Sequence, residues 1–193
     1  MKVIFRFAAV ITAAAAGLCV GVAAQNTGPT FSVQTFAAGT AVSSTEPDSI
    51  FYGDGSVWVS YTNGASSTGQ GGSSTIVRYG WNGAVQHEWT IAGNVDGLRP
   101  DPTGLVWALQ NNDGNSTLTT INPATKATTF YTYGNTYTNV ANRGFDDVEF
   151  ANGNTFLSET NPASSTDPIV VRLTTAAFAP PDLKDPDVAV YWS

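Results

Sequence analysis

The sequence has very few of the side chains from which most metal and nucleophilic centres are built. Its 193 residues include one cysteine, Cys19, and one histidine, His87. The usual zinc ligands are therefore lacking, and a Ser–His–Asp mechanism has no support because His87 is expected on an outer strand, at the surface. Cys19 falls in a segment that we expect to be removed, so the mature protein has no disulfide and depends on packing and backbone pairing.

Positive charge is also scarce. Eight Lys and Arg stand against fifteen Asp and Glu, and the formal net charge is −7. An acidic chain with no basic cluster repels nucleic acid and anionic membranes, so we expect neither as a partner. Acidic loops instead favour cations or cationic ligands.

The N-terminus has the pattern of a secretory signal peptide. Lys2 and Arg6 make a positive start, residues 7–22 are almost entirely apolar, and small residues precede a cleavage position before Gln25. The apolar stretch is shorter than the roughly 20 residues that span a bilayer. Residues 1–24 thus predict an exported protein, secreted or periplasmic.

After Gln25 no segment combines helical periodicity with helix-forming residues. The chain is instead rich in Thr, Val, Tyr, Phe and Trp, with frequent Gly, Asn and Pro between them. Strand formers separated by turn formers predict an all-β fold.

A pattern of four features occurs three times along the chain. An Asp is followed by an apolar residue two positions later, by a turn glycine, by an aromatic residue, and by an Asn five positions after the aromatic. The three Asp residues are 48 and 50 positions apart. The matched sets are Asp48, Gly55, Trp58 and Asn63; Asp96, Gly104, Trp107 and Asn112; and Asp146, Gly153, Phe156 and Asn161.

Each unit is predicted to be four antiparallel strands joined by a tight turn, a long loop and a second tight turn. Four strands at this period are typical of a propeller blade. A β-sandwich or a β-helix with coincidental spacing is the alternative, but neither usually shows self-similarity at this length. The predicted fold is thus an all-β β-propeller with about three four-stranded blades present of an expected six.

The boundaries follow from the repeat. Residues 25–46 form an N-terminal segment in which 31–36 match the outer strand of a closing blade, and residues 47–193 are an incomplete propeller with units 47–94, 95–144 and 145–193. Closing a ring takes four or more blades. We therefore expect an N-terminal fragment, with missing C-terminal blades or another chain needed as a partner to close the ring.

The repeat also predicts where a site would lie. The first two strands of each unit form a hairpin, so its Asp and its Asn meet at the end opposite the turn, at one mouth of a central channel. Asp and Asn at strand ends also cap turns, which is the structural alternative. The ligand-binding candidates are Asp48, Asp96, Asn111, Asn112, Asp147 and Asn161.

A second set of candidates is acidic. Counting from the turns places Asp146 across from Glu159, and crowded carboxylates either share a proton or recruit a cation. With Glu46 they would form an all-oxygen site suited to Ca²⁺ or Mg²⁺, the only cofactors that the sequence suggests. Arg99 and Arg143 are candidate anion-binding side chains.

The repeat resembles the six-bladed group of gluconolactonase-like, NHL-repeat and streptogramin lyase proteins. The resemblance covers Pro47 to Thr174 and depends on phrases such as Val95-Asp96-Gly97-Leu98. For the lactonases it implies a divalent metal bound by a Glu before the first inner strand, which Glu46 resembles. The later metal ligands would fall beyond Ser193, and a streptogramin lyase would need a channel histidine, which His87 does not supply.

Two functions follow from these observations. The first is an exported propeller that binds a small molecule or protein at the channel mouth, without catalysis. The second is a divalent-metal-dependent hydrolase or lyase of the lactonase type, in which the ion polarises a carbonyl or activates water. A propeller hosts either function, so the fold does not decide between them.

Overall fold

The computed structural model describes residues 31–133, 142–162 and 169–173. The expected signal peptide lies outside these ranges. The chain divides into two units between Gln34 and Thr35, and all the strands belong to the second unit. The described part of the first unit, residues 31–34, is exposed and has no regular secondary structure. Within the described ranges no helix is long and apolar enough to span a membrane.

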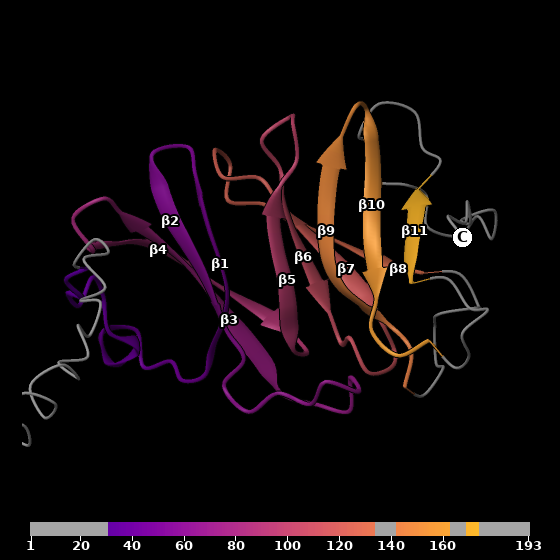
Figure 1. Ribbon diagram of the computed structural model, residues 1–193. Helices are drawn as coiled ribbons and strands as arrows, with labels where there is room; N and C mark the ends of the chain where they lie inside the picture. Colours follow the sequence, from indigo (N-terminus) through magenta and orange to yellow (C-terminus); the bar gives the residue numbers. More distant parts are fainter. Residues whose placement is uncertain (1–30, 134–141, 163–168, 174–193) are drawn as a thin grey trace, which may run out of the picture. The chain divides into compact units, whose positions relative to one another are not determined.

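Three antiparallel sheets make up the second unit, and the expectation of an all-β fold is confirmed (Figure 1). The described elements are η1 (Gly39–Ala41), β1 (Pro47–Gly53), β2 (Ser56–Tyr61), β3 (Ser73–Gly80), β4 (Val85–Ala92), β5 (Val95–Pro100), β6 (Val106–Gln110), β7 (Thr117–Ile121), β8 (Thr128–Thr132), β9 (Phe145–Ala151), β10 (Asn154–Glu159) and β11 (Val170–Leu173).

In each sheet the strands lie side by side in chain order. The first sheet is β1–β4, the second sheet is β5–β8 and the third sheet is β9–β11. The fourth strand expected in the third unit falls on residues outside the described ranges. Residues 31–36, expected to be an outer strand, have no strand assignment, because none of the described strands pairs with them.

Two of the hairpin turns have the conformation that their sequence predicts. Asp54 and Gly55 have φ angles of 51° and 65°, and Asn152 and Gly153 have φ angles of 50° and 76°. Two consecutive residues with positive φ form the tight turn that matches strand twist, and Asn-Gly and Asp-Gly are the pairs that adopt it most readily. The turns between β1 and β2, β5 and β6, and β9 and β10 lie at the same end, at the top of Figure 1.

The second sheet packs between the other two. Each sheet has an upstream face, toward the sheet that precedes it in sequence, and a downstream face, toward the sheet that follows. One core joins Trp58 and Ile76 on the downstream face of the first sheet to Leu98 and Ala108 on the upstream face of the second. The other core joins Trp107, Leu109 and Leu118 on the downstream face of the second sheet to Val148, Leu157 and Val171 on the upstream face of the third.

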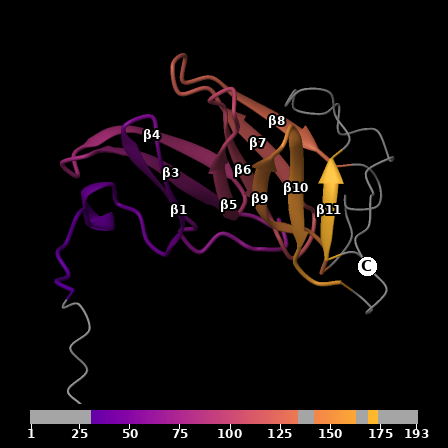
Figure 2. The same cartoon turned by 45° about the horizontal axis from the view of Figure 1, so that its top comes forward.

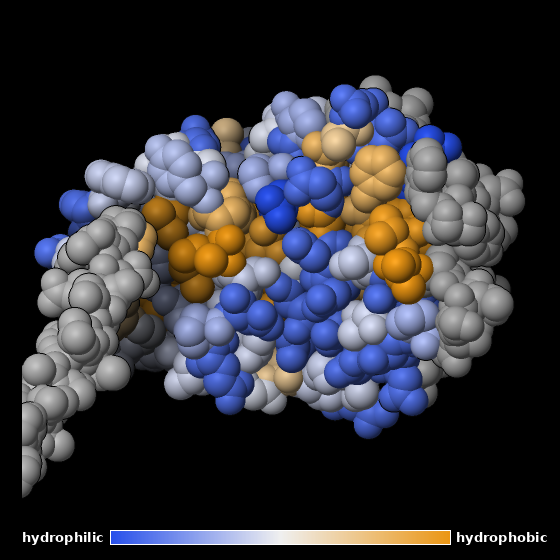
Figure 3. All heavy atoms as spheres, in the orientation of Figure 1, coloured by the Kyte–Doolittle hydropathy of each residue, from blue (hydrophilic) through white to orange (hydrophobic). Residues whose placement is uncertain are grey.

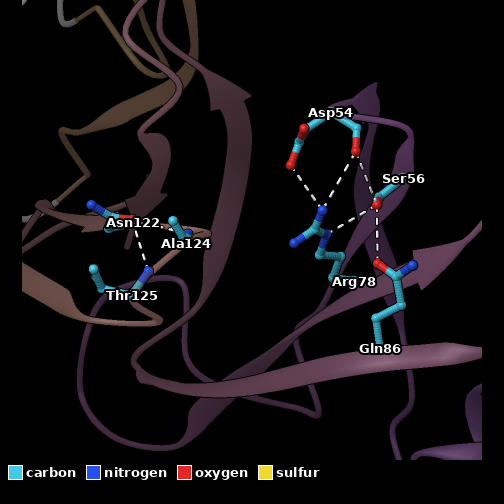
Figure 4. A network of polar contacts seen from close by, with 7 residues as sticks. All are labelled: Asp54, Ser56, Arg78, Gln86, Asn122, Ala124 and Thr125. Carbon is cyan, nitrogen blue, oxygen red and sulfur yellow. Dashed lines mark hydrogen bonds and ion pairs between the residues drawn. The ribbon is translucent and has the colours of Figure 1, made fainter.

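Polar contacts join the first hairpin turn to the third strand of the first sheet (Figure 4). Arg78 donates to the Asp54 carboxylate at 2.8 Å and to the Ser56 hydroxyl at 3.0 Å, and its guanidinium lies 5.4 Å from the centre of the Trp58 ring. The ring of Trp58 also stacks on Trp89, at 5.0 Å between centroids. The Arg78 side chain therefore ties the first hairpin turn to the aromatic core.

The first strands β1, β5 and β9 are neighbours, and their closest contacts repeat from one junction to the next. In β1, the Ser49 hydroxyl donates to the carbonyl oxygen of Asp96. In β5, Gly97 occupies the same repeat position, and a Cβ there would lie 2.5 Å from the carbonyl oxygen of Asp146. The position after the repeated Asp is therefore the point of closest approach between successive sheets.

We expect Gly97→Ala to destabilise the fold by about 1–3 kcal/mol, because the added methyl forces β5 away from β9. Chemical denaturation followed by tryptophan fluorescence measures this change. Ser49→Ala is the matched control, since it loses one hydrogen bond but adds no atom, and it should cost about 0.5–1.5 kcal/mol. Equal stability of Gly97→Ala and the unmodified protein would contradict the close approach.

Candidate functional site

The three repeated aspartates lie on adjoining strands, at the end of the sheets opposite the hairpin turns. Asp48 is in β1, Asp96 in β5 and Asp146 in β9. Each lies in a β-bulge, because the pairing shifts between Pro47 and Ile50, between Val95 and Gly97, and beside Phe145. Bulges turn a side chain out of the regular ladder and are frequent near functional sites.

The bulges also correct the register that counting from the turns predicts. Glu159 pairs with Phe145 and not with Asp146, and Tyr61 pairs with Pro47 and not with Asp48. The extra residue in each first strand therefore frees the aspartate from cross-strand pairing. Its carboxylate faces the equivalent residue of the neighbouring sheet instead.

The carboxyl groups of Asp48 and Asp96 are hydrogen-bonded to each other. Partial burial is the main cause that raises the pKa of Asp96, to about 7, and the charge of Asp48 adds to it. The pKa of Asp48 is also raised, chiefly by partial burial and further by the charge of Asp146, while its hydrogen bond to Asp96 acts in the opposite direction. Two carboxyl groups in contact keep a proton at a pH at which an isolated carboxyl group would lose it.

Asn112 is the amide residue that contacts this cluster. Its backbone N–H donates to the Asp96 carboxyl, and this contact favours the ionised form. The Asn112 side chain is half-buried, and its Oδ1 atom has no protein partner. The structure thus brings Asp48 and Asp96 together beside Asn112, and the charge of Asp146 raises the pKa of both aspartates from farther along the same end of the sheets.

Asn111 has a structural position. It is buried, has a φ of 61°, and exchanges hydrogen bonds with Asn94 through its backbone N–H and its side-chain oxygen. Its side-chain nitrogen donates to the carbonyl of Asn115 at 3.2 Å. The side-chain nitrogen of Asn111 therefore holds the loop after β6, and its oxygen holds the backbone just before β5. This is the kind of backbone capping that the structural alternative predicts.

Asp147 and Asn161 also have partners in neighbouring loops and strands. The Asp147 carboxylate accepts from the backbone N–H of Val148 at 2.8 Å and lies 3.4 Å from the Arg99 guanidinium. Arg99 in addition lies 3.4 Å from Glu149, so it ties β5 to β9 and is not open to an anion. Asn161 donates to Asp113 at 2.8 Å.

The two glutamates expected at a metal site are held in different places. Glu46 accepts from the Thr62 hydroxyl at 2.9 Å and from the backbone N–H of Gly64 at 2.7 Å. Glu159 is buried and lies 3.1 Å from Arg143. In the described ranges no three acidic, histidine or cysteine side chains gather in a way that could hold a metal ion. Glu46, Asp146 and Glu159 therefore do not form one cluster there.

Sequence reasoning did not identify Asp101, whose buried carboxylate holds the turn between β5 and β6, at the other end of β5 from Asp96. It accepts from the backbone N–H groups of Thr103 and Leu105 and from the Thr103 hydroxyl, while the Trp107 indole donates to its second oxygen at 3.0 Å. The Asp-Pro-Thr-Gly turn was visible in the sequence. The indole contact was not, because it depends on how the Trp107 side chain is turned.

Comparison with family models and with curated protein sequences gives no match to this chain. The geometry of the aspartate cluster is therefore the basis for a functional argument.

Asp96→Asn should make stability less dependent on pH. The folded protein keeps a proton on Asp96 up to a pKa of about 7, whereas the unfolded chain releases it near 3.8. The folded state therefore binds more protons between these values, and it loses stability as the pH rises through them.

We expect the Tm of Asp96→Asn to exceed that of the unmodified protein by about 2–4 °C at pH 8, the shift that about 1 kcal/mol causes at this size, and by little at pH 4. Thermal unfolding across that range measures it. Glu88→Gln removes one charge from an exposed position of β4 and should keep the original pH dependence. A parallel pH profile for Asp96→Asn would refute the shared proton.

Proposed function

We propose that the protein is a non-catalytic binding protein built as part of a β-propeller, with its ligand face at the aspartate cluster (Asp48, Asp96 and Asp146). The three sheets correspond to successive blades. This is supported by the chain order of the strands in each sheet, by the adjacency of β1, β5 and β9, and by the same face-to-face packing at both junctions. A six-bladed ring is the closed form that we propose.

The observation that carries the binding proposal is the hydrogen-bonded pair of Asp48 and Asp96 with the charge of Asp146 nearby. Neighbouring carboxylates whose charges repel each other are stabilised by a positive charge placed between them. The unpartnered Oδ1 atom of Asn112 adds a neutral acceptor beside them. We infer a ligand with an ammonium or guanidinium group, either a small molecule or a side chain of another protein.

The proposed location is outside the cytoplasm, secreted or periplasmic. This part of the proposal comes from residues 1–24, with their positive start and short apolar run. An exported protein without disulfides and with an acidic surface fits a solute-binding role.

A lactonase-type metal enzyme is the alternative, and the contacts of its expected ligands do not favour it. Glu46 already accepts two hydrogen bonds from the loop at Thr62 and Gly64, and Glu159 is paired with Arg143. To bind a divalent ion, both glutamates would have to exchange these partners.

Spermidine, a flexible cation, tests the proposal by calorimetric titration at pH 8, above the pKa of about 7 of Asp96. We expect saturable binding that weakens by about tenfold to 100-fold in Asp48→Asn and in Asp96→Asn, because each removes a charge-assisted hydrogen bond. Binding should also weaken at pH 5.5, where Asp96 holds its proton. Glu88→Gln, with the same change of net charge, should bind as the unmodified protein does.

Equal loss of affinity in Glu88→Gln would show that spermidine senses only net charge, and it would contradict a site at the cluster. A parallel titration with Ca²⁺ tests the alternative. Calcium binding that is abolished by Glu46→Gln would favour the metal enzyme.

A further inference from the structure

Each end face of the described sheet stack carries partly exposed apolar side chains. The downstream face of the third sheet also carries Asp147, Glu149 and Ser158. On the upstream face of the first sheet, Ile50 and Tyr52 are 70% and 64% exposed, and Val57 and Val59 line a groove of about 430 Å³. On the downstream face of the third sheet, Phe156 and Val170 line a smaller groove of about 190 Å³. Figure 3 shows apolar side chains gathered over β1 and β2 and again over β10 and β11.

The downstream face of the third sheet has the same layout as the two downstream faces that are packed. Trp58 pairs with Arg78, Trp107 with Thr120, and Phe156 with Arg172. Two positions before Arg78, Thr120 and Arg172, the third strand of each sheet has an aliphatic residue. These residues are Ile76, Leu118 and Val170. Ile76 and Leu118 are fully buried, whereas Val170 is 37% exposed.

The upstream face of the first sheet has the complementary layout. Ile50 occupies the repeat position of Leu98 and Val148, which are 3% and 1% exposed because each packs under the preceding sheet. Ile50 pairs with Val59 as Leu98 pairs with Ala108 and Val148 with Leu157. The segment that contains Ala37 and Val42 packs on this face with Val57, Val59 and Tyr61, and it lines the groove together with Ile50. Ile50 and Tyr52 nevertheless remain exposed.

We propose that a second copy of this chain packs the upstream face of its first sheet on the downstream face of the third sheet. Both described junctions bring a downstream face against an upstream face, and the two faces that no described sheet covers are one of each kind. A second copy supplies the missing face with the residue types and register that already form these junctions. Two copies related by a two-fold axis would form two such contacts, each between the first sheet of one copy and the third sheet of the other. The first and third sheets lie at opposite ends of the stack (Figure 2).

This proposal does not depend on a ligand at the aspartate cluster, because it follows from the packing of the sheets alone. Its outcome and that of the spermidine titration are therefore separable.

Sedimentation velocity of the purified full chain over a range of concentrations tests the proposal. We expect a species with the mass of two chains. Ile50→Glu and Val170→Glu should each weaken its formation at least about tenfold, because each places a charge in the contact. Phe156→Ser is a second downstream variant. Phe130→Glu is the control, since Phe130 is 58% exposed on β8 of the middle sheet.

An equimolar mixture of Ile50→Glu and Val170→Glu distinguishes this contact from any symmetric pairing of like faces. The Ile50→Glu chain keeps an intact downstream face, and the Val170→Glu chain keeps an intact upstream face, so the mixture should regain a two-chain species that neither variant forms alone. A monomer at every concentration would overturn the proposal. An association that resists Val170→Glu and Phe156→Ser would also overturn it.

Discussion

The structure depends on one repeated contact, in which a large flat side chain from the second strand of one sheet packs into the apolar face of the next. Trp58 shares a core with Leu98 and Ala108, and Trp107 shares one with Leu157 and packs edge-on against Phe150. Close packing of this kind leaves few voids between the sheets. The same spacing brings the first strands together, and with them the aspartates.

The aspartate cluster is thus a product of sheet packing and not of any local motif. Asp48 and Asp96 are far apart in sequence, and each belongs to a different hairpin. They meet because Ser49 and Gly97 allow successive first strands to approach closely, and because a bulge turns each carboxyl out of the ladder. Bringing these carboxyl groups together is unfavourable in free energy, and the packing of the apolar cores on either side offsets it.

Much of the local structure was predictable from the sequence. Strand-forming residues separated by Gly, Asn and Pro predicted strands and turns, and the repeat predicted the first hairpin of each unit. The bulges were not predictable, because an inserted residue changes pairing but not composition. The different roles of Asn111 and Asn112 were also hidden, since they depend on a backbone angle of 61° at Asn111. Arg99 was predicted to bind an anion because the sequence alone does not place its partners, Asp147 and Glu149 of the third sheet, beside it.

The middle sheet is the only one of the three with both faces covered by another sheet in the described structure. The stability of such a linear stack is approximately the sum of the intrinsic stability of each sheet and the energies of the interfaces between neighbouring sheets. In a single chain the outer layers share one contact and the middle layer two. The backbone amides of β6 and β7 should then exchange with solvent most slowly, and opening should begin at the ends of the stack and proceed inward.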